Sequence, residues 1–387
     1  MPIASPGVPR AAHGPAREPG LDGLRGVAAL VVVIHHALLS VPSLAEPYYG
    51  GTPSSVAGPL ARLLAWTPLH IVWAGGEAVF VFFVLSGYVL LRWQERGYSL
   101  AGYYPQRLTR LYLPVFAAVI VGTLVVAVTP RGSTDGLGVW LPLHPGASLL
   151  SSLKDAVLVL GPSGAIPPLW SLQFEVFYSV AAPLVGLVVL WWARRASRWT
   201  WLPAVLAIAF VAAMDGHKSV QLAAMFALGA SLPPLVDHLP DRLARTRPWI
   251  GVPMLVVSLL LLTAYWWPGV TNLAVPTTGA ALLVVLAVTS EPTSKLLSAR
   301  PTRWLGMISF SLYLIHEPIE VLLGFLLGPG NGGWVLVIGV PVSLAAAWLF
   351  WRFAEAPAHR LSRAIGQRAS AARRSSGADP TTATGDS

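Results

Sequence analysis

Ten apolar segments constrain this chain more than any other feature of its sequence. About 20 apolar residues, at a rise of 1.5 Å each, are enough for a helix to cross a hydrocarbon core about 30 Å thick. Only 11% of the 387 residues are charged, whereas soluble proteins average about 25%. The sequence therefore predicts an all-α, polytopic integral membrane protein with about ten transmembrane helices. The segments are 24–41, 72–91, 111–129, 170–192, 200–214, 220–235, 249–267, 270–289, 304–327 and 334–353.

Basic residues are distributed unevenly among the connections between these segments. If the segments alternate in direction, all but four of the 26 Lys and Arg residues fall on one side of the membrane. The exceptions are Arg62, Arg131, Lys154 and Lys218. Because cytoplasmic loops are enriched in Lys and Arg, this bias places both termini in the cytoplasm. It predicts a multi-pass protein of the cell membrane, with the lipid bilayer as its surroundings.

The formal net charge of +9 and the absence of cysteine narrow the possible functions. The basic residues form short clusters beside apolar segments, as juxtamembrane arginines do, and this placement argues against a nucleic-acid partner. A chain without cysteine forms no disulfide, no thiolate metal site and no cysteine acyl-enzyme. Any activated nucleophile must therefore be oxygen or nitrogen. We expect no metal site and no bound cofactor.

The domain organisation follows from composition. Residues 1–20 are rich in Pro, Ala and Gly and lack an apolar core, so they predict a flexible cytoplasmic N-terminus rather than a cleavable signal peptide. Residues 21–358 form the membrane domain. Residues 359–387 are basic and then polar, which is typical of a disordered cytoplasmic tail. Within the long outer connection over residues 130–169, residues 148–160 are a candidate interfacial or re-entrant helix.

His36 lies inside the first apolar segment, eleven residues after Arg25. At about 100° per residue, eleven residues make three turns plus about 20°, so both side chains leave one helix face, roughly 16 Å apart along the axis. His35 is turned about 100° away from that face. Ionisable residues are costly inside a membrane and are functional candidates there. We therefore favour a functional role for His36 over a structural interhelical hydrogen bond.

Three further ionisable residues fall at a similar depth. A rise of 1.5 Å per residue places His36 and His316 roughly 18 Å above the inner edge, and Glu77 and Glu175 roughly 8 Å below the outer edge. All four occupy one layer slightly outward of the midplane. They form a candidate acid–base cluster, because a carboxylate fixes the tautomer of an imidazole and raises its basicity. His316 has an alternative role, since it precedes Pro318 and could satisfy backbone groups that proline frees.

Other ionisable residues are expected to contact water or the bundle interior. Glu317 and Glu320 lie on the ninth segment and are expected to face either the bundle interior or the outer water. The remaining histidines lie in loops or near helix ends and are expected to be solvated: His13, His70, His144, His217, His238 and His359.

The cytoplasmic mouth carries a second set of charges. Arg25, Arg107 and Arg110 all lie near the inner edge. Arg107 and Arg110 share a face if the third helix begins before them, because residues three apart are neighbours on a helix. Guanidinium groups bind phosphates well, so we predict an inner vestibule for a phosphorylated ligand. The alternative is that these arginines only anchor the topology.

Five stretches together resemble acyltransferase family 3, the polytopic membrane O-acyltransferases. Residues 21–36 resemble the first-helix motif, an arginine followed by ten residues and a histidine. Residues 79–88 are similar to the second-helix Phe-Phe-Val-Leu-Ser-Gly signature, and residues 107–112 to the basic motif of the third helix. Residues 169–178 resemble a segment with Trp-Ser-Leu-x-x-Glu followed by Phe-Tyr, and residues 308–316 give a weaker match.

This resemblance implies O-acyl transfer from acyl-CoA, often acetyl-CoA, to a hydroxyl acceptor. Family acceptors include sugars of cell-surface polysaccharides, lipid-linked glycans and macrolide-type small molecules, so polysaccharide O-acetylation is one expected role. The acyl-CoA is a co-substrate rather than a bound cofactor. Direct attack on the thioester and a transient acyl-histidine are both compatible with the motifs.

The resemblance also implies roles for individual residues. His36 would be the general base, with Glu175 orienting it, while Arg25, Arg107 and Arg110 bind the nucleotide of acyl-CoA. Further substrate-binding candidates are Ser86, His316 and Glu77. With Gly87, Ser86 would allow close approach of backbone or donate a hydrogen bond to the thioester. Many members carry an acidic residue where this chain has Phe80, and Glu77, one turn earlier, is the candidate substitute.

Two other functions use the same residues. A proton-coupled transporter or exporter would use the buried His and Glu residues as a proton relay, but the sequence contains no inverted repeat. A non-catalytic partner would only pass an acyl group across the membrane. We therefore expect a membrane O-acyltransferase, with a transporter as the alternative.

Overall fold

The computed structural model describes residues 18–49, 57–94, 99–195, 217–237, 248–264 and 273–376, and these residues are predominantly helical. The fold-class prediction of an all-α protein is confirmed over these ranges. The helices are α1 (Pro19–Leu39), α2 (Pro42–Tyr49), α3 (Pro59–Ala65), η1 (Pro68–Trp73), α4 (Gly75–Gln94), α5 (Leu100–Val128), η2 (Leu141–Leu143), α6 (Leu149–Val157), α7 (Leu169–Ala193), α9 (Lys218–Asp237), α11 (Pro248–Leu262), α12 (Ala274–Thr289), α13 (Glu291–Leu297), α14 (Arg300–Leu327), α15 (Gly332–Trp334), η4 (Val335–Gly339), α16 (Val340–Phe350), η5 (Trp351–Glu355) and α17 (Ala356–Ser376).

Within the described ranges, seven helices are long and apolar enough to cross a membrane. They are α1, α4, α5, α7, α9, α14 and the continuous run over Gly332–Ala371. The apolar helices α11 and α12 are shorter. The predicted segment 200–214 lies outside the described residues. A multi-pass helical membrane protein is therefore supported, while the count of ten spans and the cytoplasmic termini stay predictions.

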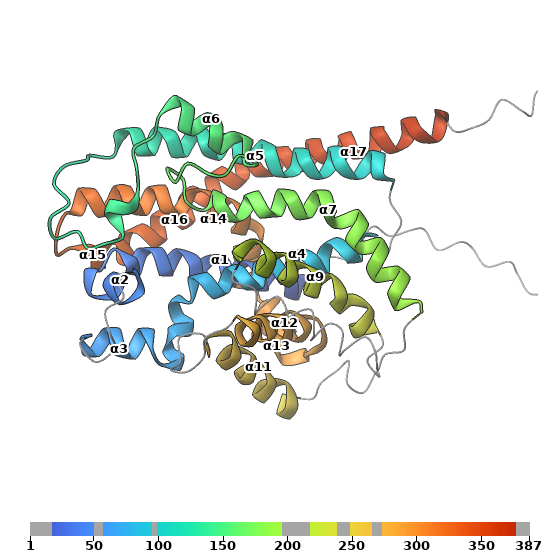
Figure 1. Ribbon diagram of the computed structural model, residues 1–387, viewed down its shortest axis with the longest axis horizontal. Helices are drawn as coiled ribbons and strands as arrows, with labels where there is room; N and C mark the ends of the chain where they lie inside the picture. Colours follow the sequence, from blue (N-terminus) through green and yellow to red (C-terminus); the bar gives the residue numbers. More distant parts are fainter. Residues whose placement is uncertain are drawn as a thin grey trace, which may run out of the picture.

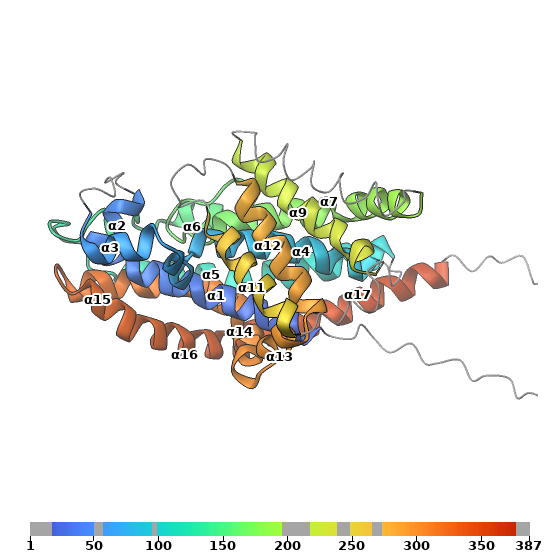
Figure 2. The same ribbon diagram turned by 90° about the horizontal axis from the view of Figure 1, so that it is seen from below.

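The helices form a flattened bundle with α1 and α4 at its middle (Figure 1). Along one edge in this view, α5 and α17 run side by side, and α11, α12 and α13 lie at the opposite edge. In the turned view the run from α15 to α17 follows one side of the molecule from orange to red (Figure 2). In this arrangement α1 packs against both α4 and α14.

Glycines on α1 allow its close contact with α13 and α14. A Cβ atom at Gly23 would overlap the carbonyl oxygen of Leu297, and one at Gly26 would overlap the backbone nitrogen of Gly306. Without an aqueous driving force between helices in lipid, such small residues let backbones approach and gain packing energy. The glycines in the motif around Arg25 therefore fix the position of α1 against α14, on which His316 lies.

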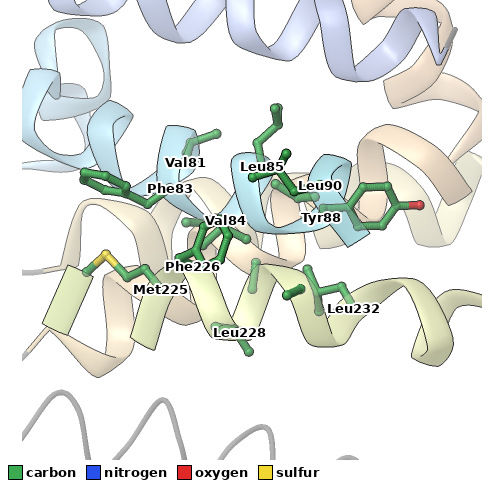
Figure 3. Packing of buried hydrophobic residues seen from close by; sticks show 14 of the residues in the cluster. Val81, Phe83, Val84, Leu85, Tyr88, Leu90, Met225, Phe226, Leu228 and Leu232 are labelled. Carbon is green, nitrogen blue, oxygen red and sulfur yellow. The ribbon is translucent and has the colours of Figure 1, made fainter. Parts of the chain in front are cut away.

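The second-helix signature contributes to packing in the same way. A Cβ atom at Gly87 on α4 would overlap the carbonyl oxygen of Phe226 on α9, and one at Gly229 would overlap the carbonyl oxygen of Val84. Around this crossing, apolar side chains of the two helices interdigitate, including Phe83 and Met225 (Figure 3). The expected close backbone approach at Gly87 is therefore made with a neighbouring helix.

The third helix begins earlier than predicted. Residue 111 was the expected start, whereas α5 begins at Leu100, where the side chain of Ser99 accepts a hydrogen bond from the backbone of Gly102. This hydroxyl satisfies one of the orphan amide donors at the helix start. The extension places Arg107 and Arg110 three residues apart within one helix, as the vestibule hypothesis requires.

The tail is ordered over part of its length. The prediction of disorder from residue 359 is corrected for residues up to 376, because α17 continues to Ser376. Its small residues pack on the start of α5: Ser370 forms a 3.2 Å hydrogen bond with Ser99, and a Cβ atom at Gly102 would overlap the Ser370 hydroxyl. Composition alone missed this tertiary contact. Residues 1–17 and 377–387 of the predicted termini lie outside the described residues.

The connection over residues 130–169 contains the expected short helix. Within residues 148–160, α6 spans Leu149–Val157 and starts with a capping box between Ser148 and Ser151. The Ser152 hydroxyl lies 2.8 Å from that of Thr123 on α5. Leu149 and Leu150 are 79% and 78% exposed, as expected of apolar residues that face lipid or an interface.

Candidate active site

His36 is held on the last turns of α1, three turns above Arg25 on the same helix. Both side chains are partly accessible, whereas His35 is buried. The Nδ1 atom of His35 lies 2.7 Å from the carbonyl oxygen of Trp73, to which it donates. The structure therefore assigns the two adjacent histidines to different surroundings, as the helix phase predicts.

His36 contacts His316 of α14. Nδ1 of His36 lies 2.9 Å from Nε2 of His316. The ring centroids are 5.1 Å apart and the planes differ by 6°. The indole of Trp140 also stacks against His36, with ring centroids 5.8 Å apart. The two histidines that the depth estimate placed in one layer are thus in direct contact.

Hydrogen bonds define the tautomers of this pair. Nδ1 of His316 lies 2.9 Å from the carbonyl oxygen of Leu312 and 3.0 Å from that of Tyr313. A carbonyl oxygen only accepts, so Nδ1 carries the proton and Nε2 of neutral His316 is an acceptor. Nδ1 of His36 must then donate to it. The lone pair of neutral His36 is left on Nε2, for which no hydrogen bond is recorded within the described ranges.

Glu317 is the carboxylate beside His36. Its Oε2 lies 3.6 Å from Nδ1 of His36, and its Oε1 lies 3.0 Å from Nε2 of His144. Nδ1 of His144 donates to the carbonyl oxygens of Trp140 and Leu141, at 3.1 and 3.3 Å. The contact between His144 and Glu317 therefore needs a second proton, on either Nε2 or the carboxyl group.

His144 was expected to be solvated, and this expectation is wrong. Its side chain is 5% exposed, and Trp140 packs edge-on against it at 4.7 Å. His144 directly follows the short helix η2. The sequence offers one signal for this burial, which is that His144 lies four residues after Trp140 in a Pro-rich loop. The position of a residue in a loop does not by itself indicate whether its side chain is buried.

Glu175 does not contact His36. Its Oε1 accepts a 2.8 Å hydrogen bond from Arg107, whose Nε donates to the Ser179 hydroxyl at 2.9 Å. Glu175 and Ser179 are one turn apart on α7 and together orient the Arg107 guanidinium. The structure therefore brings Glu175 to Arg107 and not to His36, and the carboxylate beside His36 is that of Glu317.

Arg25 and Arg110 lie near Arg107. Arg110 interacts electrostatically with Arg107, with Arg25 and with the carboxylate of Glu355. Glu355 is itself occupied, since its Oε2 accepts hydrogen bonds from the backbone and hydroxyl of Ser311. Within the part of the chain that the structure describes, no hydrogen bond is recorded for the guanidinium of Arg25 or Arg110. Three like charges gathered in this way favour an anionic ligand.

Glu77 belongs to a neighbouring buried group. Its Oε1 lies 3.4 Å from Nε2 of His70, and His70 is fully buried rather than solvated as expected. His35 connects the two groups, because its ring lies 5.3 Å from that of His36. Glu77 is therefore near the His36 cluster without contacting it. Ser86 lies on α4 and is half-buried, and the structure records no hydrogen bond for it among the described residues.

Comparison with known proteins gives a family and several relatives. Residues 18–352 match the model of the acyltransferase domain family. The acyltransferase MdmB of Streptomyces mycarofaciens is 28% identical over 89% of this chain and 92% of its own length. The putative peptidoglycan O-acetyltransferase YrhL of Bacillus subtilis is 24% identical over 88% of this chain and 54% of its own length.

A third relative is similar over most of this chain. The O-acetyltransferase PaAT-1 of Phomopsis amygdali is 26% identical over 80% of this chain and 73% of its own length. The chain therefore spans most of MdmB but only about half of YrhL. No solved structure matches.

Proposed function

This chain belongs to the acyltransferase domain family over residues 18–352, and we propose that it transfers an acyl group, in the simplest case acetyl, from acyl-CoA to a hydroxyl group. Membership makes it an enzyme that transfers acyl groups other than amino-acyl groups. The proposed acceptor is a carbohydrate, a glycolipid or a secondary metabolite. The proposed location is the cell membrane.

The tautomer of His36 is the observation that carries this proposal. With Nδ1–H directed at His316, the lone pair on Nε2 of His36 accepts the proton of the acceptor hydroxyl. The hydroxyl oxygen then forms a bond to the thioester carbonyl carbon, and the carbon–sulfur bond breaks. The proton on Nε2 passes to the leaving thiolate, which gives free CoA. General base catalysis of this kind typically contributes 10²–10⁴-fold to rate.

Glu317 supports the same step electrostatically. When His36 holds the extra proton, its positive charge lies 3.6 Å from Oε2 of Glu317. In a buried site such a charge interaction is stronger than in water. His144 holds the other carboxylate oxygen in place at 3.0 Å. Glu317, held by His144, thus stabilises the imidazolium form of His36, which exists only during proton transfer.

Arg25, Arg107 and Arg110 are the proposed binding site for the phosphates of acyl-CoA. Guanidinium groups bind phosphate by paired hydrogen bonds. Arg25 lies roughly 16 Å below His36 along α1, and the extended pantetheine arm separates the CoA phosphates from the thioester over a comparable length. In this proposal Glu175 orients Arg107 and touches neither the acceptor nor the thioester.

The relatives support a hydroxyl group, and in the case of YrhL a glycan, as the acceptor. YrhL is named as a putative peptidoglycan O-acetyltransferase, and PaAT-1 as an O-acetyltransferase. A hydroxyl is the group that an O-acetyltransferase modifies, and His36 is suited to deprotonate one. Polysaccharide O-acetylation is therefore the first acceptor class to test.

The test uses the full chain in lipid nanodiscs with acetyl-CoA labelled in its acetyl group. We expect one free CoA for each acetyl ester formed on oligosaccharide or small-molecule acceptors, and no ester when the acceptor is omitted. Vesicles containing the protein provide the second arm. Movement of a solute without consumption of acyl-CoA would contradict the proposal and favour a transporter.

A further inference from the structure

Glu320 is a buried carboxylate that the proposed acyl transfer does not use. It is 0% exposed, and among the described residues neither of its carboxylate oxygens has a hydrogen-bond partner. Burying an ionised group without a partner is costly, and such groups are usually paired or coordinate a metal. Within the membrane domain this residue therefore calls for a cationic or proton-donating partner.

The position of Glu320 brings it next to the two histidines of the cluster. It lies four residues after His316 on α14, so both side chains leave the same helix face. His36, His316 and Glu320 each offer one ligand atom, and these atoms lie within 4.8 Å of one another. Two helices, α1 and α14, thus converge on one small volume with two imidazole nitrogens and a carboxylate oxygen.

The hydrogen bonds of His316 are those of a metal ligand. A metal-bound histidine usually donates its other ring N–H to a carboxylate or a backbone carbonyl, which fixes its tautomer. Nδ1 of His316 donates to the carbonyl oxygens of Leu312 and Tyr313. Its Nε2 lone pair is therefore directed toward His36, as coordination of a shared ion requires.

We propose that His36, His316 and Glu320 form a binding site for a divalent transition-metal ion, with Zn²⁺ as the best match to the donors. Zn²⁺ takes imidazole nitrogen and carboxylate oxygen at about 2.0–2.2 Å, and four-coordinate sites often have three protein ligands. The ion replaces the hydrogen bond between the histidines. Their nitrogens, now 2.9 Å apart, need only a small separation to become neighbouring ligands.

Metal binding has a direct consequence for His36. A neutral imidazole that binds a metal through one nitrogen carries its proton on the other. Whichever nitrogen of His36 binds the ion, no lone pair remains to accept a proton from a hydroxyl. Zn²⁺ is therefore an inhibitor that competes with general base catalysis. This consequence rests on the proposed function, whereas the binding site itself does not.

Direct binding is measured first, on tag-free full-length protein in nanodiscs after treatment with a chelator. Equilibrium dialysis against Zn²⁺ is expected to give one ion per chain, and Co²⁺ is expected to give visible absorption bands of a low-coordinate site. Glu320→Gln and His316→Gln should each weaken Zn²⁺ binding roughly 10- to 100-fold or more, since even supporting residues contribute that much. Glu77→Gln is the control, because Glu77 is another buried carboxylate beside a histidine, 3.4 Å from His70.

Inhibition is measured second, as the rate of acyl transfer with Zn²⁺ relative to the metal-free rate of the same variant. We expect inhibition of the wild type that a chelator reverses, and a higher inhibitory concentration for Glu320→Gln. Equal Zn²⁺ affinity in the wild type and both ligand variants, or no Co²⁺ spectrum in the wild type, would overturn the site. Tight binding without any acyl transfer would instead reject the proposed function and leave the metal site standing.

Discussion

Nδ1 of His36 and Nε2 of His316 lie 2.9 Å apart, with their rings stacked within 6° of parallel. The contact joins α1 to α14 ten residues further along both helices than Gly26 and Gly306, where a Cβ atom at Gly26 would overlap the backbone of Gly306. The backbone hydrogen bonds of His316 set which nitrogen of His36 is free.

The first prediction concerns the acceptor that His316 provides. In His316→Phe, Nδ1 of His36 loses its partner and the tautomer of His36 is no longer fixed. We expect kcat to fall roughly 10²-fold, within the range of general base effects, with little change in KM for acyl-CoA. His316→Gln offers a side-chain oxygen and should restore part of the loss. Initial rates under saturating acyl-CoA measure both variants, and a wild-type kcat in His316→Phe would exclude this role.

The second prediction concerns His144 and Glu317, which are linked at 3.0 Å. His144→Gln and Glu317→Gln should each lower kcat about tenfold or more, because both weaken the stabilisation of protonated His36. Residues in one hydrogen-bonded network are not additive. The double variant should therefore be little slower than Glu317→Gln alone, which a double-mutant cycle measures. Fully multiplicative losses would mean that the two residues act separately.

The third prediction separates two roles for Glu175. The 2.8 Å bond to Arg107 implies that Glu175 positions the proposed phosphate site. Glu175→Gln should therefore raise KM for acyl-CoA about tenfold, a value at the low end for a charge-assisted hydrogen bond because the pair is partly exposed. We expect kcat to change much less. Steady-state kinetics with acyl-CoA as the varied substrate gives both parameters. A large loss of kcat at unchanged KM would contradict this role and indicate instead that Glu175 acts on the general base, His36.

The fourth prediction tests the α4–α9 crossing. In Gly87→Ala the new Cβ overlaps the carbonyl oxygen of Phe226, so the helices must separate. Overpacking of this kind typically costs about 1–3 kcal/mol, and we expect a lower Tm and a lower yield of monodisperse protein. Gly58→Ala is the matched control, because nothing lies within 4 Å of a Cβ atom there. Equal thermal stability of the two variants would contradict the packing role of Gly87.

The parts of this structure that local periodicity controls are those that the sequence predicts well. Apolar length locates the spanning helices, and the helical repeat places Arg25 and His36 on one face of α1. The depth estimate brings His36 and His316 into one layer, because depth depends only on rise per residue.

The contacts between segments could not be predicted in this way. Depth alone does not decide whether Glu317 or Glu175 lies beside His36. The answer depends on which helix packs against α1. The burial of His144 depends on how a loop folds. A loop has no periodic pattern from which the burial of its side chains can be predicted. Glu320 follows His316 by four residues, and that spacing was available as a signal. Its significance is apparent only once both carboxylate oxygens are seen to lack hydrogen-bond partners in the part of the chain that the structure describes.

The most direct test of the account compares His36→Ala with His35→Ala in the acetyl-transfer assay, with binding of CoA measured separately. His36 holds the free Nε2 lone pair, whereas His35 donates to the carbonyl oxygen of Trp73 and lies outside the cluster. The account predicts that His36→Ala lowers kcat by 10²–10⁴-fold with CoA binding unchanged, and that His35→Ala has a much smaller effect. Full activity in correctly folded His36→Ala would contradict it.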